Sequence, residues 1–208
     1  MKKIILEKKE HSIRIGKRCE FIKPTITESC LLIHQNKIIG FYLTDLPKKL
    51  IQYISIANNE FLSDNVPKTL LERSDIYEKQ KKFGITRKQA KALGTPQMST
   101  ILGSVLAKPH LRRPYNSISS VHTNKKSKTF LKAMLLACSE CEKLIKKHMP
   151  EQYESQKKLI EDNVLPQFRF GKLFTSSISN YNIAAPYHQD RGNLKNTVNA
   201  ILTKRVDS

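Results

Sequence analysis

A histidine and an aspartate two residues apart, His188 and Asp190, are the side chains of this 208-residue chain best suited to carry chemistry. On an extended strand, residues two apart point to the same side, so the imidazole and the carboxylate can reach one metal ion. Two His and one carboxylate on one face of an octahedron leave three positions open, which suits Fe(II), a bidentate cosubstrate and dioxygen. Six His and six Asp in the chain give about 0.17 such triplets by chance, so the surrounding sequence must decide between this site and an ordinary surface turn.

The sequence around this triplet resembles the metal motif of Fe(II)/2-oxoglutarate-dependent dioxygenases. Residues 174–182 read Phe-Thr-Ser-Ser-Ile-Ser-Asn-Tyr-Asn, and residues 185–193 read Ala-Pro-Tyr-His-Gln-Asp-Arg-Gly-Asn. They are most similar to the TET and J-binding-protein (TET/JBP-like) group, including its phage and viral members, in which a strand ending in N-x-N precedes H-x-D-x-x-N. Shorter upstream similarities to the viral members are Gly94-Thr95-Pro96, Arg113-Pro114-Tyr115, and Pro150-Glu151-Gln152-Tyr153 with Gln156. The resemblance covers about residues 30–205.

The resemblance assigns roles to five residues. His188 and Asp190 match the first two iron ligands, and Asn193 matches the asparagine that faces the target base. An amide suits that position because it offers both a donor and an acceptor to a base edge. Arg112 or Arg113 is expected to bind a phosphate or a cosubstrate carboxylate, and the choice between the two stays open.

The function that the resemblance implies is hydroxylation of a methyl group on a nucleic-acid base, thymine or 5-methylcytosine. Fe(II) would be the metal and 2-oxoglutarate the co-substrate. The base must be extruded from a duplex or presented on a single strand, so a basic surface is needed beside the pocket. DNA is the favoured polymer.

The family also needs a second iron-binding His and a distal basic residue, both well downstream of H-x-D. No His follows His188 in the 208 residues, and Arg205 is too close to match the distal position. We therefore expect the front part of a site, inactive alone, and two ligands alone would hold Fe(II) weakly. Three explanations stay open, in this order: a truncated or split reading frame, a degenerate relative that keeps only binding, or a second polypeptide that supplies the missing groups. Three earlier histidines are not expected to complete the site: His110, His122 and His148.

The charge of the chain favours a polyanionic partner. Lys and Arg number 37 against 18 Asp and Glu, a formal net charge of +19. Residues 79–139 contain thirteen Lys and Arg and not one Asp or Glu, which favours phosphate contacts over a merely solvated face. A membrane partner is not expected, because no helix combines a Trp/Phe-rich face with a lysine face. The alternative function is therefore a non-catalytic, basic nucleic-acid-binding protein derived from the same family, and whether the chain is an enzyme stays open.

The termini and cysteines indicate an intracellular protein. Residues 1–10 lack the apolar stretch of a signal peptide, so we expect the cytoplasm or nucleus rather than secretion. The apolar stretches are too short to span a membrane. Disulfides are not expected among Cys19, Cys30, Cys138 and Cys141, and the C-x-x-C pair 138–141 is predicted to face the core rather than a metal.

The elements that must position the motif predict an α+β protein in three segments. Residues 1–78 form a small α/β region, 79–126 a basic, loop-rich segment, and 127–208 a helix followed by the first strands of the dioxygenase barrel. The expected fold is thus a helical support plus an incomplete double-stranded β-helix, a jelly-roll or cupin-like architecture, at the C-terminus.

Periodicity and turn residues predict individual elements within these segments. The predicted elements are a hairpin of 30–33 and 38–43, a helix from Pro47, a short helix within 79–91, an extended loop over 94–128, helices over 127–148 and 151–160, and strands over 172–182 and 197–203. The helix from Pro47 should carry Leu50, Ile51, Ile54 and Phe61 near one face, and the 127–148 helix should carry an apolar stripe of Phe130, Met134, Ala137, Cys141, Leu144 and Ile145. Ser127 or Thr129 is predicted to cap the latter helix, and Asn180 and Asn182 are equally compatible with ordinary turn chemistry.

Overall fold

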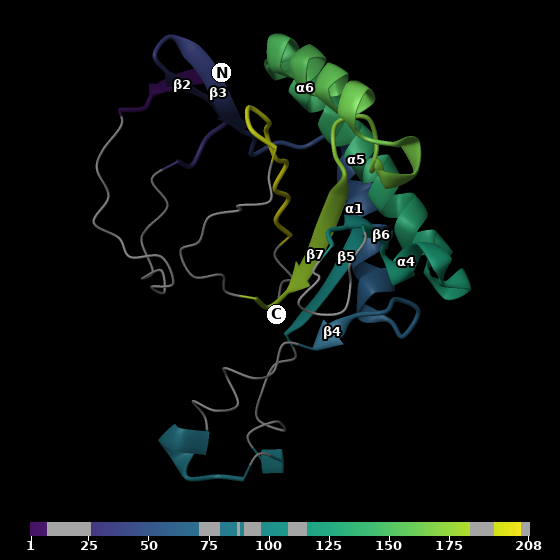
Figure 1. Cartoon of the computed structure of the whole chain (residues 1–208). Coiled ribbons are helices and arrows are strands. Elements are labelled where there is room, and N and C mark those ends of the chain that lie inside the picture. Colours follow the sequence, from purple (N-terminus) through teal and green to yellow (C-terminus); the bar gives the residue numbers. More distant parts are fainter. Residues whose placement is uncertain are drawn as a thin grey trace.

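The structure is a computed structural model that describes residues 1–7, 26–70, 80–86, 88–89, 97–107, 116–183 and 194–204. In this part of the chain the protein is a mixed α+β structure with two small sheets (Figure 1). The predicted α+β class is confirmed. The described strands do not form a double-stranded β-helix, so that finer part stays a prediction.

The first sheet contains β1 (Lys2–Ile5), β2 (Cys30–His34) and β3 (Lys37–Tyr42) in that order. β1 runs parallel to β2, and β2 runs antiparallel to β3. The predicted hairpin is confirmed, and Gln35 and Asn36 form its turn with φ of 48° and 60°. Positive φ at both central residues suits the twist of a two-residue hairpin turn.

The first long helix, α1 (Lys48–Leu62), begins directly after Pro47 as predicted. Leu50 and Phe61 are buried and Ile54 is packed against the core. The prediction for Ile51 was wrong: 52% of it is exposed, because the helix buries a narrower stripe than the apolar spacing indicated.

Two further long helices follow each other along the chain, α5 (Lys128–His148) and α6 (Pro150–Asn163), and they confirm the predicted helix pair. α1 and α6 both pack against α5. Ser127 is the N-cap residue of α5, as predicted, but its side chain makes no capping hydrogen bond, and Thr129 lies inside the helix. Ser127 Oγ instead donates a hydrogen bond to the carbonyl oxygen of Asn65, 2.8 Å away, and so joins the start of α5 to the loop after α1. The short helical elements are α4 (Ser120–Thr123), η2 (Lys125–Ser127) and η3 (Pro166–Phe168), and residues 80–83 are also helical.

The second sheet is built around one central strand, β5 (Met98–Val105). β7 (Ser176–Tyr181) pairs antiparallel with β5 from Met98 to Gly103. Two short strands pair with opposite ends of the other edge of β5: β4 (Thr69–Leu70) at Met98 and Ser99, and β6 (Ser117–Ile118) at Ser104 and Val105. The middle of that edge therefore has no described strand beside it.

β5 corrects the prediction of an extended loop over residues 94–128. The segment is rich in Ser, Thr and Gly, which concealed a strand alternation in which Met98, Thr100 and Leu102 are buried. Gly103, with φ of 78°, lies so close to Thr175 that a Cβ atom would stand 2.5 Å from the Thr175 carbonyl oxygen.

The strand predicted over residues 197–203 is also corrected, because this segment has no regular secondary structure. Its Val198 is bonded by a glutamine side chain rather than by a neighbouring strand, as described below.

The main apolar core lies between the second sheet and the helices. Its buried members include Phe61 of α1, Leu102 of β5 and Phe130 of α5, so all three predicted segments of the chain contribute to it. Among the described residues, no helix is both long and apolar enough to cross a membrane.

Candidate functional site

The five residues predicted for the site lie outside the described residues: His188, Asp190, Asn193, Arg112 and Arg113. The structure does place the elements on either side of the H-x-D segment. β7 ends at Tyr181, just before it, and the described chain resumes at Leu194.

One face of β7 packs toward the helices, and no described helix or strand covers its other face. Burial alternates along it, and Tyr181 packs on the main core together with α1 and α5 residues. Ile178 and its partner Ile101 point the other way and are 59% and 40% exposed. Figure 1 shows α1 and α5 on one side of β5 and β7. The strand that leads to H-x-D thus belongs to a helix-backed sheet whose second face carries an exposed apolar pair.

The two asparagines of the N-x-N pattern have different roles. Asn180 Oδ1 accepts a hydrogen bond from Ser99 Oγ across the β5–β7 pair, at 2.8 Å. Asn182 has φ of 54°, a left-handed conformation that asparagine tolerates in turns. The turn interpretation therefore holds for Asn182, whereas Asn180 is a cross-strand residue.

Two glutamines of α6 hold the chain just after the H-x-D segment. Gln156 is 2% exposed, and its Oε1 accepts a bond from the Val198 N–H at 2.8 Å. Its Nε2 donates to the carbonyl oxygens of Leu173 and Val198, at 2.9 and 3.2 Å. Gln152 Nε2 donates to the carbonyl oxygen of Asn196 at 2.7 Å. Both glutamines belong to the sequence similarity, and the structure shows that they fix residues 196–198 against α6.

A buried carboxylate holds the turn before β7. Glu142 of α5 accepts hydrogen bonds from the backbone N–H groups of Lys172 and Leu173, the latter at 3.1 Å. Gly171 lies against it with φ of 75°, and a Cβ atom there would stand 2.5 Å from Glu142 Oε1. The carboxylate therefore ties α5 to the turn that aims β7.

The C-x-x-C pair is buried beside this carboxylate. Burial, with the nearby Glu142, raises the pKa of the Cys138 thiol well above its usual range and raises the pKa of Cys141 to about 11. Thiols held protonated in this way are poor nucleophiles and poor metal ligands. The prediction of a core-facing pair is confirmed.

Two histidines considered earlier are engaged in the fold. His122 Nε2 accepts a hydrogen bond from the Gly103 N–H at 2.8 Å, and burial lowers its pKa. The His148 ring lies 5.0 Å from the Phe41 ring, and burial together with Lys147 lowers its pKa. Within the described part of the chain, no group of three or more His, Cys, Asp or Glu is placed to hold a metal ion.

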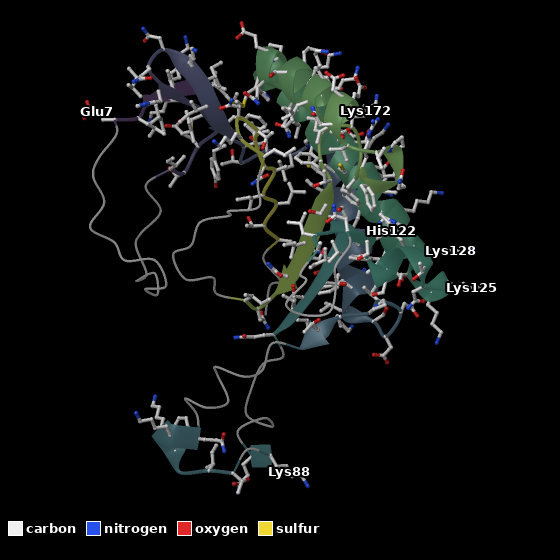
Figure 2. All side chains as sticks on the ribbon, in the orientation of Figure 1. Glu7, Lys88, His122, Lys125, Lys128 and Lys172 are labelled. Carbon is white, nitrogen blue, oxygen red and sulfur yellow. The ribbon has the colours of Figure 1, made fainter. Side chains whose placement is uncertain are left out.

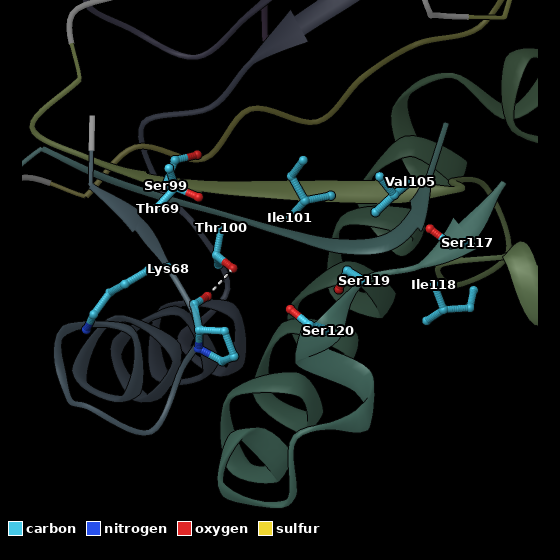
Figure 3. A pocket seen from close by; sticks show the side chains of 11 residues that line it. Lys68, Thr69, Ser99, Thr100, Ile101, Val105, Ser117, Ile118, Ser119 and Ser120 are labelled. Atoms are coloured by element: carbon cyan, nitrogen blue, oxygen red, sulfur yellow. Dashed lines mark hydrogen bonds between the residues drawn. The ribbon is translucent and has the colours of Figure 1, made fainter. Parts of the chain in front are cut away.

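A cleft opens on the unpaired middle of the β5 edge (Figure 3). Its volume is about 530 Å³, and it is lined by residues 67–69, 99–101, 105 and 117–120, which include six serines and threonines; we call it the hydroxyl cleft. Thr100 Oγ1 donates to the Pro67 carbonyl oxygen at 2.6 Å, and Lys68 Nζ donates to the carbonyl oxygen of Phe61 at the end of α1. Ser119 is only 6% exposed, yet its hydroxyl has no hydrogen-bond partner among the described residues.

Exposed lysines gather at the start of α5. Lys125, Lys126, Lys128 and Lys132, which we call the α5 lysine group, make no ion pair with any described acidic residue. Figure 2 shows Lys125 and Lys128 projecting from this end of the molecule. The lysines farther along α5 and on α6 are different, because four of them pair with acids: Lys143–Glu140, Lys146–Glu154, Lys157–Glu161 and Lys158–Asp162.

The hydroxyl cleft was missed by the sequence analysis. The sequence feature that could have indicated it is the group of serines within residues 117–120, which was interpreted as ordinary loop composition. A second cavity of about 630 Å³ lies between β3, α5 and residues 197–203, and no charged side chain lines it.

Comparison of the chain with protein-family models, curated proteins and solved structures finds no match. Support for a function therefore comes from the motif and from the geometry of the described residues.

Proposed function

We propose that the chain is part of a 2-oxoglutarate- and Fe(II)-dependent dioxygenase that hydroxylates a methyl group on a nucleic-acid base, thymine or 5-methylcytosine. One observation supports this most: β7, the strand before H-x-D, lies in an antiparallel sheet with helices on one face and no described helix or strand on the other. A double-stranded β-helix has the same plan, in which helices support one sheet and a second sheet covers its other face.

In this proposal His188 and Asp190 hold Fe(II), because imidazole nitrogen and carboxylate oxygen are donors that suit this ion. Bound there, the metal would activate dioxygen, which is the oxidant; one oxygen atom would enter the methyl group and the other would oxidise 2-oxoglutarate to succinate and CO2. Asn193 faces the base, and Arg112 or Arg113 binds a phosphate or the cosubstrate carboxylate.

The described residues support the proposal through the way they hold the chain on each side of the motif, and not through the chemistry of the motif itself. The β5–β7 ladder holds the chain up to Tyr181, and Gln156 and Gln152 hold residues 196–198. Both flanks of the H-x-D segment are therefore attached to the helix-backed core. A segment held at both ends loses less conformational entropy when it binds a ligand than a free tail does.

The alternative is a nucleic-acid-binding protein without catalysis. The exposed α5 lysine group favours it, because phosphate binding needs these charges and does not need the metal motif. Both candidates bind nucleic acid, and they differ in whether His188 and Asp190 bind a metal.

Metal titration separates the two. We expect the chain to bind Mn(II), used as a stable stand-in for Fe(II), with an affinity that falls at least about tenfold in His188→Ala and in Asp190→Ala. His34→Ala and Asp162→Ala are the matched controls, since both remove the same residue types at described positions outside the H-x-D motif. Two protein ligands hold such an ion weakly, so the affinity of the chain itself should be low. Equal Mn(II) affinity in all five proteins contradicts the dioxygenase proposal and leaves the alternative.

A further inference from the structure

We infer that a single nucleic-acid strand crosses the N-terminal end of α5, with its phosphates on the α5 lysine group and its backbone entering the hydroxyl cleft. This rests on the proposed function only in taking nucleic acid as the ligand. The inference names the face of the molecule that binds the nucleic-acid strand. It applies both to the enzyme and to the non-catalytic alternative.

The first support is the uneven pairing of lysines. Both lysines of α6, and Lys143 and Lys146 late in α5, lie within 4 Å of acids, so their charges are already balanced locally, whereas Lys147 has no such pair among the described residues. The α5 lysine group has no such partner among the described residues, and no acid lies in the first turn of α5. Four exposed like charges at a helix N-terminus gain nothing from the helix dipole. Phosphates would balance them.

The second support is the continuity between these lysines and the hydroxyl cleft. Ser119 and Ser120 line the cleft, and the short α4 and η2 elements lead from Ser120 directly to Lys125 and Lys126. The bond from Ser127 Oγ to the Asn65 carbonyl oxygen brings the start of α5 to the loop that continues into the cleft wall at residues 67–69. One strand can therefore contact both features.

The third support is the chemistry of the cleft. On β5, the N–H and C=O of Gly103 point to the His122 and Ser119 side. By the alternation of a strand, Ile101, two residues earlier, should point its backbone groups the same way. It lies between the last residue paired with β4 and the first paired with β6. Serine and threonine hydroxyls and backbone N–H groups are common phosphate and sugar contacts in nucleic-acid complexes.

The fourth support is the Ser119 hydroxyl, which is more than nine-tenths buried and has no described partner. Buried polar atoms nearly always have a partner, so an unbonded one marks a place where a ligand or water completes the structure. Figure 3 shows its side chain among those that line the cleft. One torsion moves a serine hydroxyl, and turning this one toward the cleft breaks no protein hydrogen bond.

The lysine contacts are tested by salt dependence with a charge-matched control. Lys125→Gln/Lys126→Gln/Lys128→Gln removes three charges from the proposed face, and Lys146→Gln/Lys157→Gln/Lys158→Gln removes three from the ion-paired region. The probe is a short fluorescent oligothymidylate titrated between about 50 and 200 mM salt. We expect the first triple variant to lower the slope of log affinity against log salt by about 2, since each phosphate contact on a single strand contributes about 0.7. The control should keep the wild-type slope.

The cleft is tested by two buried serines that differ in bonding. Ser119→Ala removes a hydroxyl with no described partner, so its melting temperature should equal or exceed that of the wild type, while its affinity for the oligonucleotide falls about fivefold. Ser127→Ala removes the bond to Asn65, so it should melt at a lower temperature and keep its affinity.

Several outcomes overturn the inference. It fails if Ser119→Ala binds like the wild type or is destabilised as Ser127→Ala is, or if both triple variants lose slope equally. It also fails if the chain binds vesicles of anionic lipid but not the oligonucleotide. If every variant binds the oligonucleotide like the wild type, nucleic acid remains the partner and only the proposed binding face is rejected. A wild-type chain that does not bind the oligonucleotide removes the nucleic-acid partner of the proposed function as well, whereas failure of the Mn(II) titration alone leaves this face untouched.

Discussion

The two ends of α5 differ in how completely their polar groups are satisfied. From its middle toward its C-terminal end, Glu142 is buried with two backbone donors, the thiols of Cys138 and Cys141 are protonated, and Lys143 is paired with Glu140. At its N-terminal end, the α5 lysine group has no described acidic partner, and the nearby Ser119 hydroxyl has no described partner at all.

This difference separates groups that hold the fold from groups that, in our proposal, bind a ligand. A buried polar atom costs free energy unless it is bonded, so a fully bonded cluster indicates a structural role. Exposed charges without partners cost little in stability and are available to bind phosphate. Changes at the Glu142 end should therefore act on unfolding, and changes at the lysine end on binding.

The largest effect is expected for Glu142→Ala. It leaves the N–H groups of Lys172 and Leu173 without an acceptor and opens a cavity beside Gly171, so the free energy of unfolding should fall by about 3 kcal/mol. Urea denaturation measures this. Glu161→Ala, which breaks only an exposed pair with Lys157, should cost less than about 1 kcal/mol. Similar losses for the two variants would mean that the buried carboxylate is not a structural anchor.

A smaller effect is expected from pH at the other end. His122 must be neutral to accept the Gly103 N–H, and its pKa in the folded state lies below the usual value of 6.5. The unfolded chain thus takes up this proton first, and stability present above about pH 6.5 is lost as the pH falls toward the folded-state pKa. We expect the melting temperature to fall by about 2 to 4 °C across this window.

His122→Gln provides the check on this assignment. The glutamine oxygen can accept the same bond without titrating, so the variant should lose this part of the pH dependence. His34→Gln, at a half-buried position on β2, should keep it. An unchanged pH profile in His122→Gln would assign the effect to another group.

Periodicity predicted some of the fold well. The α5 and α6 helices and the 30–43 hairpin carry strong local patterns, with a stripe ending at Ile145 and a turn at Gln35 and Asn36, and local patterns were sufficient for them. β5 could not be predicted in this way, because only its pairing with β7, more than seventy residues away, distinguishes it from a loop.

The candidate site was predictable in its motif but not in its surroundings. His188 and Asp190 are recognisable from spacing and context. The bonds that Gln156 makes to Val198, and the missing partner of Ser119, arise only from tertiary packing. The basic stretch 79–139 predicted phosphate contacts without saying where they lie. The start of α5 became the candidate only in the structure, where acids lie beside lysines such as Lys146 and Lys157 and not beside the α5 lysine group.

Photo-crosslinking tests the proposed contrast between the two ends of α5 most directly. The full chain, bound to a single-stranded oligonucleotide containing 4-thiothymidine, is irradiated and digested, and the crosslinked peptides are identified by mass spectrometry. We predict crosslinks in residues 117–132, which contain the cleft serines and the α5 lysine group, and none in α6, where the lysines are ion-paired. Crosslinks concentrated in α6, or spread equally over both regions, would contradict it.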